Sequence, residues 1–322
     1  MRILSKIILS AAITIGVVVP AAAQSDYPNK PIKLVVPFPA GSATDTVARI
    51  MAAPMAAALG QPIVIDNKGG ADGAIGGQAV ARSAPDGYTL FMATNSPMAA
   101  VPVLHKNPPY NSLTDFTPIS FVGRTTFYLV VNSQLPVKTL DELIQYAKTN
   151  PGKLNYASSS TTGIVSMAQL LSLAGVKMQH IPYKGEPAAM LDLVANRVQV
   201  MFSSSTNAAP FIAEGKIRAL ATTNLSRSAQ LPDVPTMAEA GMPRFAISPW
   251  LAVFGPAGMP KEIVTRLNKE IVAAFAREDV KAQMAKQAFP AEASTPEQLG
   301  AYLKDQVALW KKTAAEAGIE PQ

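Results

Sequence analysis

The chain has 322 residues, of which 48% are hydrophobic and 16% charged, and a formal net charge of +6, which is the composition of an ordinary globular protein. The basic excess is mild and scattered, so it argues against a partner nucleic acid. The chain has no cysteine and 2 histidines, which excludes a disulfide framework, a lipid-attachment cysteine and a His/Cys metal cluster. We therefore expect no metal and no cofactor.

The N-terminal segment has the pattern of a secretory signal peptide. Arg2 and Lys6 supply positive charge, and an apolar run over 7–19 is followed by small residues. The pattern predicts that residues 1–23 form a signal peptide cleaved after about Ala23, so that the mature protein lies in the periplasm. A membrane anchor is the alternative, but the apolar run is short for a span.

Short β-type runs alternate with helical patterns through most of the chain, which favours an α/β fold with parallel sheets. The expected strands are Ile32–Phe38, Ile63–Asp66, Thr89–Ala93, Ile119–Gly123, Phe127–Asn132, Leu154–Ala157, Gln179–Pro182, Gln199–Phe202, Ile217–Ala221 and Trp250–Phe254. The expected helices are Ala43–Leu59 (kinked or shortened at Pro54), Ala74–Ser83, Leu140–Thr149, Ile164–Ala174, Pro187–Ala195, Ala208–Glu214 and most of 261–318.

Two segments lead from a strand of one α/β unit directly toward a strand of the next, near 123–127 and near 244–250. A chain that leaves one domain and returns to it forms two hinges with a cleft between the lobes. The pattern predicts a lobe 1 of residues 26–124 plus 250–322 and a lobe 2 of residues 125–249. In open α/β sheets, ligands bind at the carboxyl ends of the strands, where helices begin.

The turn after the first expected strand is a candidate anion-binding site, because a helix N-terminus presents backbone N–H groups and a positive dipole end. Ser42 and Asp45 have capping-box spacing, so Ser42 is an N-cap, a ligand contact, or both. Asp45 either orients the turn or accepts from an amino group of a ligand, and the apolar residue before the turn forms a wall of the site or part of the core. The candidate ligand-binding residues here are Phe38, Ala40, Gly41, Ser42 and Asp45.

The glycine-rich run GGADGAIGG opens a second helix. It lacks the G-x-G-x-x-G spacing of a dinucleotide site, so it does not support nucleotide binding. Its glycines permit close approach of a ligand to the backbone, or tight packing of the helix on a sheet. We expect ligand contacts from Ala71, Gly73, Ala74 and Ile75.

Small hydroxyl and amide side chains follow three other expected strands. Each cluster supplies helix N-caps, but the two longer clusters have more such side chains than one cap needs, which leaves some to line a cleft. Neither longer cluster contains lysine or arginine, so hydroxyls, amides and helix dipoles would hold an anion. The candidates are Thr94, Asn95, Ser158, Ser159, Thr161, Thr162, Ser203 and Ser204.

Catalysis has little support in the sequence. It contains no G-x-S-x-G elbow and no Walker loop. His105 and His180 are far apart in the chain, and His180 lies in an apolar run typical of a structural side chain. We expect a protein that is not an enzyme, with an exported serine hydrolase as the remote alternative.

Several motifs in order closely resemble the Bug family of periplasmic solute receptors of tripartite tricarboxylate transporters. They read YPNKPIKLVVPFPAGSATD, GADGAIGG, APDGYT and HIPYKGEPAAMLDLVANRVQVMF. The resemblance spans essentially the whole mature chain. It implies a type II periplasmic-binding-protein fold, with two α/β lobes joined by two crossing strands and a ligand cleft between them. It also implies an organic carboxylate as ligand, held partly by the loops matching 38–45 and 71–75, often through water, and membrane permease subunits as partners. We expect a monomer.

Two departures from the family pattern suggest the ligand. Ser42 replaces one of two usual glycines, and Ser203 stands where the family often has an acidic residue. The first change adds a hydroxyl, and the second is expected to remove a negative charge. We therefore hypothesise a dicarboxylate that bridges the lobes, including an aromatic one such as a phthalate isomer. The alternative is a neutral or zwitterionic solute, such as an amide or an amino acid, which Asp45 would favour.

Overall fold

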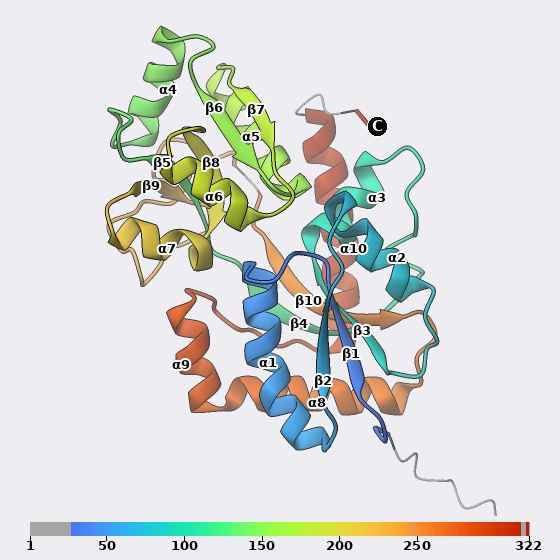
Figure 1. The fold of residues 1–322 in the computed structure, drawn as a ribbon. Coiled ribbons are helices and arrows are strands. Elements are labelled where there is room, and N and C mark those ends of the chain that lie inside the picture. The colour runs from blue at the N-terminus through green and yellow to red at the C-terminus, as the bar shows by residue number, and fades with distance from the viewer. Residues whose placement is uncertain (1–26, 246, 317–319, 322) are drawn as a thin grey trace, which may run out of the picture.

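The computed structural model describes residues 27–245, 247–316 and 320–321, which form two lobes, each built on a five-stranded sheet with helices on both faces (Figure 1). The sheet of lobe 1 has the order β2-β1-β3-β10-β4, and that of lobe 2 has the order β7-β6-β8-β5-β9. The strands are β1 (Ile32–Val36), β2 (Ile63–Asn67), β3 (Thr89–Thr94), β4 (Phe116–Arg124), β5 (Phe127–Asn132), β6 (Asn155–Ser158), β7 (Gln179–Pro182), β8 (Val200–Ser204), β9 (Ile217–Thr222) and β10 (Trp250–Pro256).

The helices cover both faces of each sheet, because side chains alternate between the faces along a strand. On β1, Ile32, Leu34 and Val36 face a core formed with α1, α8 and α9, whereas Val35 faces a core formed with α2 and α10. In lobe 2, α4 and α5 cover one face, and α6 and α7 cover the other. The helices are α1 (Ala43–Leu59), η1 (Ala71–Gly73), α2 (Ala74–Ala81), η2 (Ser96–Ala100), α3 (Val101–Leu104), α4 (Leu140–Thr149), α5 (Thr161–Ala174), α6 (Glu186–Val194), α7 (Ser205–Ala213), α8 (Lys261–Ala276), α9 (Glu278–Lys286) and α10 (Pro296–Glu316).

The expected α/β fold is confirmed, but each sheet is mixed, because one strand in each runs against its neighbours. These strands are β10, which is antiparallel to β3 and β4, and β5, which is antiparallel to β8 and β9. Each arrives from the other lobe and enters its sheet at the carboxyl end of a parallel strand, where Leu251 pairs with Thr94 and Phe127 pairs with Ser204. A strand that enters from that edge has to run the opposite way.

Several helix boundaries differ from the expected ones. Helix α1 continues past Pro54 to Leu59, so the proline does not shorten it. Helices α5 and α7 begin at Thr161 and Ser205, earlier than expected, because the serines immediately before them act as N-caps. Part of each hydroxyl-rich cluster is therefore the first turn of a helix.

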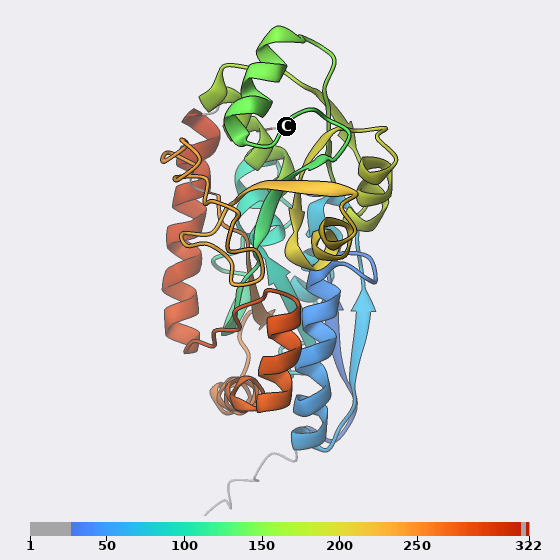
Figure 2. The same cartoon turned by 90° about the vertical axis from the view of Figure 1, so that its left-hand side faces the viewer.

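The two crossing segments lie side by side at the back of the cleft. The Thr125 amide donates to the Pro249 carbonyl at 3.0 Å, and Arg124 pairs with Trp250 where β4 meets β10. Helix α10 runs along lobe 1 and reaches toward lobe 2 (Figure 2). There Trp310, which is 2% exposed, packs in a cluster with Val165 of α5. The position of the lobe boundaries themselves, 26–124 plus 250–322 and 125–249, remains a proposal.

Candidate functional site

The largest concentration of predicted site residues surrounds a cleft between the lobes. Residues of both lobes line it. The N-terminus of α1 faces it from lobe 1, and the N-terminus of α5 faces it from lobe 2. The predicted residues that line it are Phe38, Ser42, Thr94, Asn95, Ser159 and Thr162.

At the start of α1, Ser42 is both an N-cap and a wall of the cleft. Its Oγ accepts from the Asp45 amide at 3.3 Å. Gly41 adopts a φ of 80°, a left-handed conformation that suits glycine, and its amide donates to Asp45 Oδ2 at 3.0 Å. A hydroxyl that accepts from the helix still has its own proton to donate, so the Ser42 side chain is able to hold a carboxylate oxygen. Ala40 and Gly41 themselves lie exposed on the turn, outside the cleft lining.

Asp45 orients the turn and does not face the cleft. It is 3% exposed, and its oxygens accept from Gly41, Arg49 and Asn67, the last at 3.0 Å. Arg49 also forms an ion pair with it, at 2.9 Å between Nη2 and Oδ1. Burial opposes ionisation of this carboxyl, but the hydrogen bonds from Arg49, Gly41 and Asn67 outweigh it, so the pKa of Asp45 lies below its usual value. The charge of Asp45 is thus already paired within lobe 1, and Asp45 does not line the cleft.

The glycine-rich loop contacts lobe 2 through a residue that the sequence did not single out. Asp72, at a φ of 55°, lies between Ala71 and Gly73, and its Oδ1 accepts from the Thr161 amide at 2.8 Å. Ala71 and Gly73 line a neighbouring hollow together with Ser158 and Ser159. Ala74 is buried and Ile75 is 53% exposed, and neither lines the cleft or this hollow.

The start of α5 closes against lobe 1. Asn95 Nδ2 donates to Thr162 Oγ1 at 2.8 Å, so two polar residues of the cleft wall bond across the lobes. Ser160 caps the helix by accepting from the Gly163 amide at 3.4 Å. The Thr161 backbone amide donates to the Asp72 carboxylate. Ser159, Ser160 and Thr162 of this turn line the cleft.

Ser158 and His180 are the described residues that most resemble the serine–histidine pair of a hydrolase. Ser158 Oγ lies 2.6 Å from His180 Nε2, and the imidazole stacks on Tyr156 with ring centroids 4.9 Å apart. Burial lowers the pKa of His180. Among the described residues no carboxylate contacts the other ring nitrogen, which is the group that would orient a catalytic histidine. Nor do they include a cluster of metal-binding side chains.

Ser203 and Ser204 do not line the cleft, because both are fully buried and their side chains bind Glu186. Glu186 opens α6, and its carboxylate accepts from Ser203 Oγ at 2.8 Å, from Ser204 Oγ at 3.0 Å, from Asn207 Nδ2 at 2.9 Å and from the Ser204 amide. Glu186 does line the cleft. The expectation that Ser203 removes the negative charge from this end is therefore wrong: a carboxylate from another element occupies it.

The sequence also missed most of the apolar walls. Phe127, Phe202, Pro249 and Trp250 line the cleft beside Phe38. Phe127 and Trp250 begin the two strands that enter from the other lobe, so their position at the cleft follows from the crossings. The order of the elements along the chain could have predicted this position, because a strand that starts at a crossing starts at the cleft.

A cleft between two α/β lobes that are joined by paired crossings defines a two-lobed solute-binding protein. None of the described helices is both long and apolar enough to cross a membrane.

Comparison with known proteins identifies the family. Residues 47–319 match the model of the tripartite tricarboxylate transporter family receptor, and the chain belongs to that family. The chain is 38% identical to protein BugT of Bordetella pertussis over 312 residues, 95% of each chain. It superposes on the structure of R. palustris Rpa4515 with adipate with a TM-score of 0.89 and 34% identity, covering 92% of this chain and 100% of that one. It superposes on MatC (Rpa3494) from Rhodopseudomonas palustris with bound malate with a TM-score of 0.83 and 32% identity, covering 89% and 99%.

Proposed function

We propose that this receptor captures a small organic carboxylate in the periplasm and delivers it to the membrane permease subunits of a tripartite transporter. The observation that carries the proposal is that the N-termini of α1 and α5 face one cleft from opposite lobes. Each of these long helices has a positive dipole end and small polar side chains there, which favour an anion. We further propose that the receptor acts as a monomer and that its signal peptide, which lies outside the described residues, ends near Ala23.

We propose a dicarboxylate as the preferred ligand. One carboxylate would lie at Ser42 and the first turn of α1, and the other at Ser159 and Ser160 before α5, so that the solute bridges the lobes. The cluster after β8, one of the two hydroxyl-rich clusters expected to line the cleft, instead binds Glu186. Two structural relatives support a dicarboxylate, since their structures contain adipate and malate. The aromatic walls make a phthalate isomer part of the same proposal.

A thermal-shift screen followed by calorimetry tests the proposal. Succinate, adipate and the phthalate isomers are compared with butyrate, hexanoate and benzoate, and with neutral amides. A ligand that binds the folded state alone adds about 2.7 kcal/mol to the free energy of unfolding at a hundredfold excess over its Kd. We expect dicarboxylates to raise the melting temperature most. Equal affinity for the monocarboxylate analogues would contradict the dicarboxylate, and a shift by amides alone would contradict carboxylate binding.

A further inference from the structure

The cleft of this carboxylate receptor has one ionisable lining residue, and that residue is an acid. Among the described residues that line it, Glu186 alone carries a titratable side chain, and the rest are apolar, hydroxyl or amide groups and backbone. A solute with only carboxylates would meet a like charge there, with no lysine or arginine in the lining to offset it. A carboxylate that also carries a cationic group would therefore match this lining better than a simple dicarboxylate.

The partners of Glu186 hold its carboxylate in place without neutralising its charge. All four donors, from Ser203, Ser204 and Asn207, are neutral. In the described part of the chain no ion pair includes Glu186, whereas Asp45, the buried acid at the start of α1, has Arg49. Burial raises the pKa of Glu186, and its hydrogen bonds do not offset that effect. Glu186 is half-buried, and a desolvated carboxylate without a cationic partner favours a cation that enters the cleft.

We propose that Glu186 makes the receptor select carboxylates that also carry a cationic nitrogen. The inference rests on the proposed function: the carboxylates lie at the starts of α1 and α5, and the ammonium group faces Glu186. The charge of Glu186 and the fixed orientation given by its four donors make it a specificity-determining residue. Asp45, which the sequence suggested for this role, is already paired within lobe 1.

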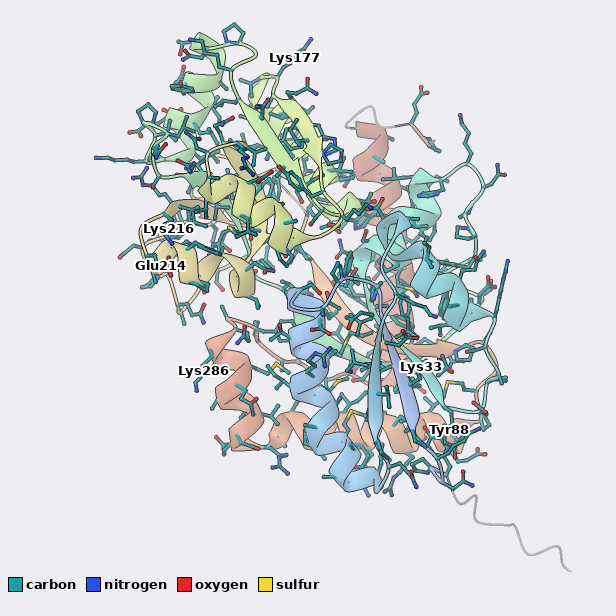
Figure 3. All side chains as sticks on the ribbon, in the orientation of Figure 1. Lys33, Tyr88, Lys177, Glu214, Lys216 and Lys286 are labelled. Carbon is teal, nitrogen blue, oxygen red and sulfur yellow. The ribbon has the colours of Figure 1, made fainter. Side chains whose placement is uncertain are left out.

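The test compares solutes that differ by one ammonium group. Calorimetry measures succinate against aspartate, glutarate against glutamate, and butyrate against 4-aminobutyrate, with the wild type and with Glu186→Gln. Glutamine is close to isosteric and keeps one acceptor oxygen. The control is Glu214→Gln, which removes a carboxylate from the outer side of lobe 2, where Glu214 pairs with Lys216 at 2.6 Å away from the cleft (Figure 3). Circular dichroism and melting curves check that both variants fold.

We expect the wild type to bind the ammonium-bearing member of at least one pair about tenfold or more tightly. The preference should disappear in Glu186→Gln and persist in Glu214→Gln. Equal binding within every pair, or a preference that survives Glu186→Gln, overturns the inference while leaving carboxylate binding intact. If no carboxylate of either kind binds, the proposed function fails, and the inference fails with it.

Discussion

The Asp72 carboxylate accepts a hydrogen bond from the Thr161 amide at 2.8 Å, so a residue of lobe 1 binds one backbone amide in the first turn of a lobe 2 helix. Beside this contact, Asn95 donates to Thr162. Together they hold the two walls of the cleft against each other. An internal carboxylate at the start of α5 stabilises this arrangement of the lobes in the way that a bound anion does.

The Asp72 contact predicts that its loss opens the lobes. Asp72→Gly removes the carboxylate at a position whose φ of 55° suits glycine, so the loop itself is not strained. A hydrogen bond to a charged group contributes about 1.5–3 kcal/mol. We expect small-angle scattering of the ligand-free variant to show a larger radius of gyration than the wild type. Asp72→Asn keeps an acceptor oxygen, so its radius of gyration should lie between those of Asp72→Gly and the wild type. Coincident scattering curves for all three proteins would contradict the role of Asp72 in holding the lobes together.

Ser42 predicts separate effects on stability and on affinity. Loss of an N-cap side chain costs about 1 kcal/mol with alanine and a few tenths with glycine. Ser42→Ala should therefore lower the free energy of unfolding more than Ser42→Gly. Both variants remove the hydroxyl that lines the cleft, so both should weaken carboxylate binding about five- to tenfold, the value of one hydrogen bond. Calorimetry with unchanged affinity in Ser42→Gly would restrict Ser42 to its capping role.

Asp45 predicts a loss of stability in acid. Its pKa is lower in the folded protein than in the unfolded chain, so the unfolded chain binds the proton more readily. The stabilisation is thus complete above the unfolded pKa of about 3.9 and is lost as the pH falls through the folded value. Asp45→Asn should cost about 1–3 kcal/mol at pH 7, where the wild type has the full set of charged hydrogen bonds. Urea unfolding at pH 7 and pH 3 should show the difference between the two proteins shrinking in acid.

The raised pKa of Glu186 predicts the opposite dependence of stability on pH. Its pKa is raised in the folded protein, so the folded state retains the proton while the unfolded chain loses it as the pH rises above about 4.3. The wild type therefore loses stability relative to Glu186→Gln as the pH rises through this window. Melting curves between pH 4 and pH 7 should show the melting temperature of Glu186→Gln rising relative to that of the wild type. A constant difference would mean that Glu186 ionises as freely in the folded protein as in the unfolded one.

The sequence predicts the fold well, because alternation and turn chemistry are local properties. Leu34 and Val36 alternate with residues of the opposite face, and Ser160 stands before its helix as a cap. The pairing of Glu186 with Ser203 and Ser204 was missed because it joins α6 to the end of β8, and nothing local reports which acid meets which hydroxyl. The role of Asp72 was missed for the same reason, since its partner lies on the other lobe.

The position of β10 in its sheet affects the order in which the two sheets can form as the chain is synthesised. This strand lies between β3 and β4, so β4 has no hydrogen-bonded neighbour on that side until residues 250–256 have emerged. All the strands of lobe 2 lie within 127–222, and its sheet needs nothing from later in the chain. The lobe that comes second along the chain can thus complete its sheet first. The lobe that contains the N-terminus must wait for its last strand.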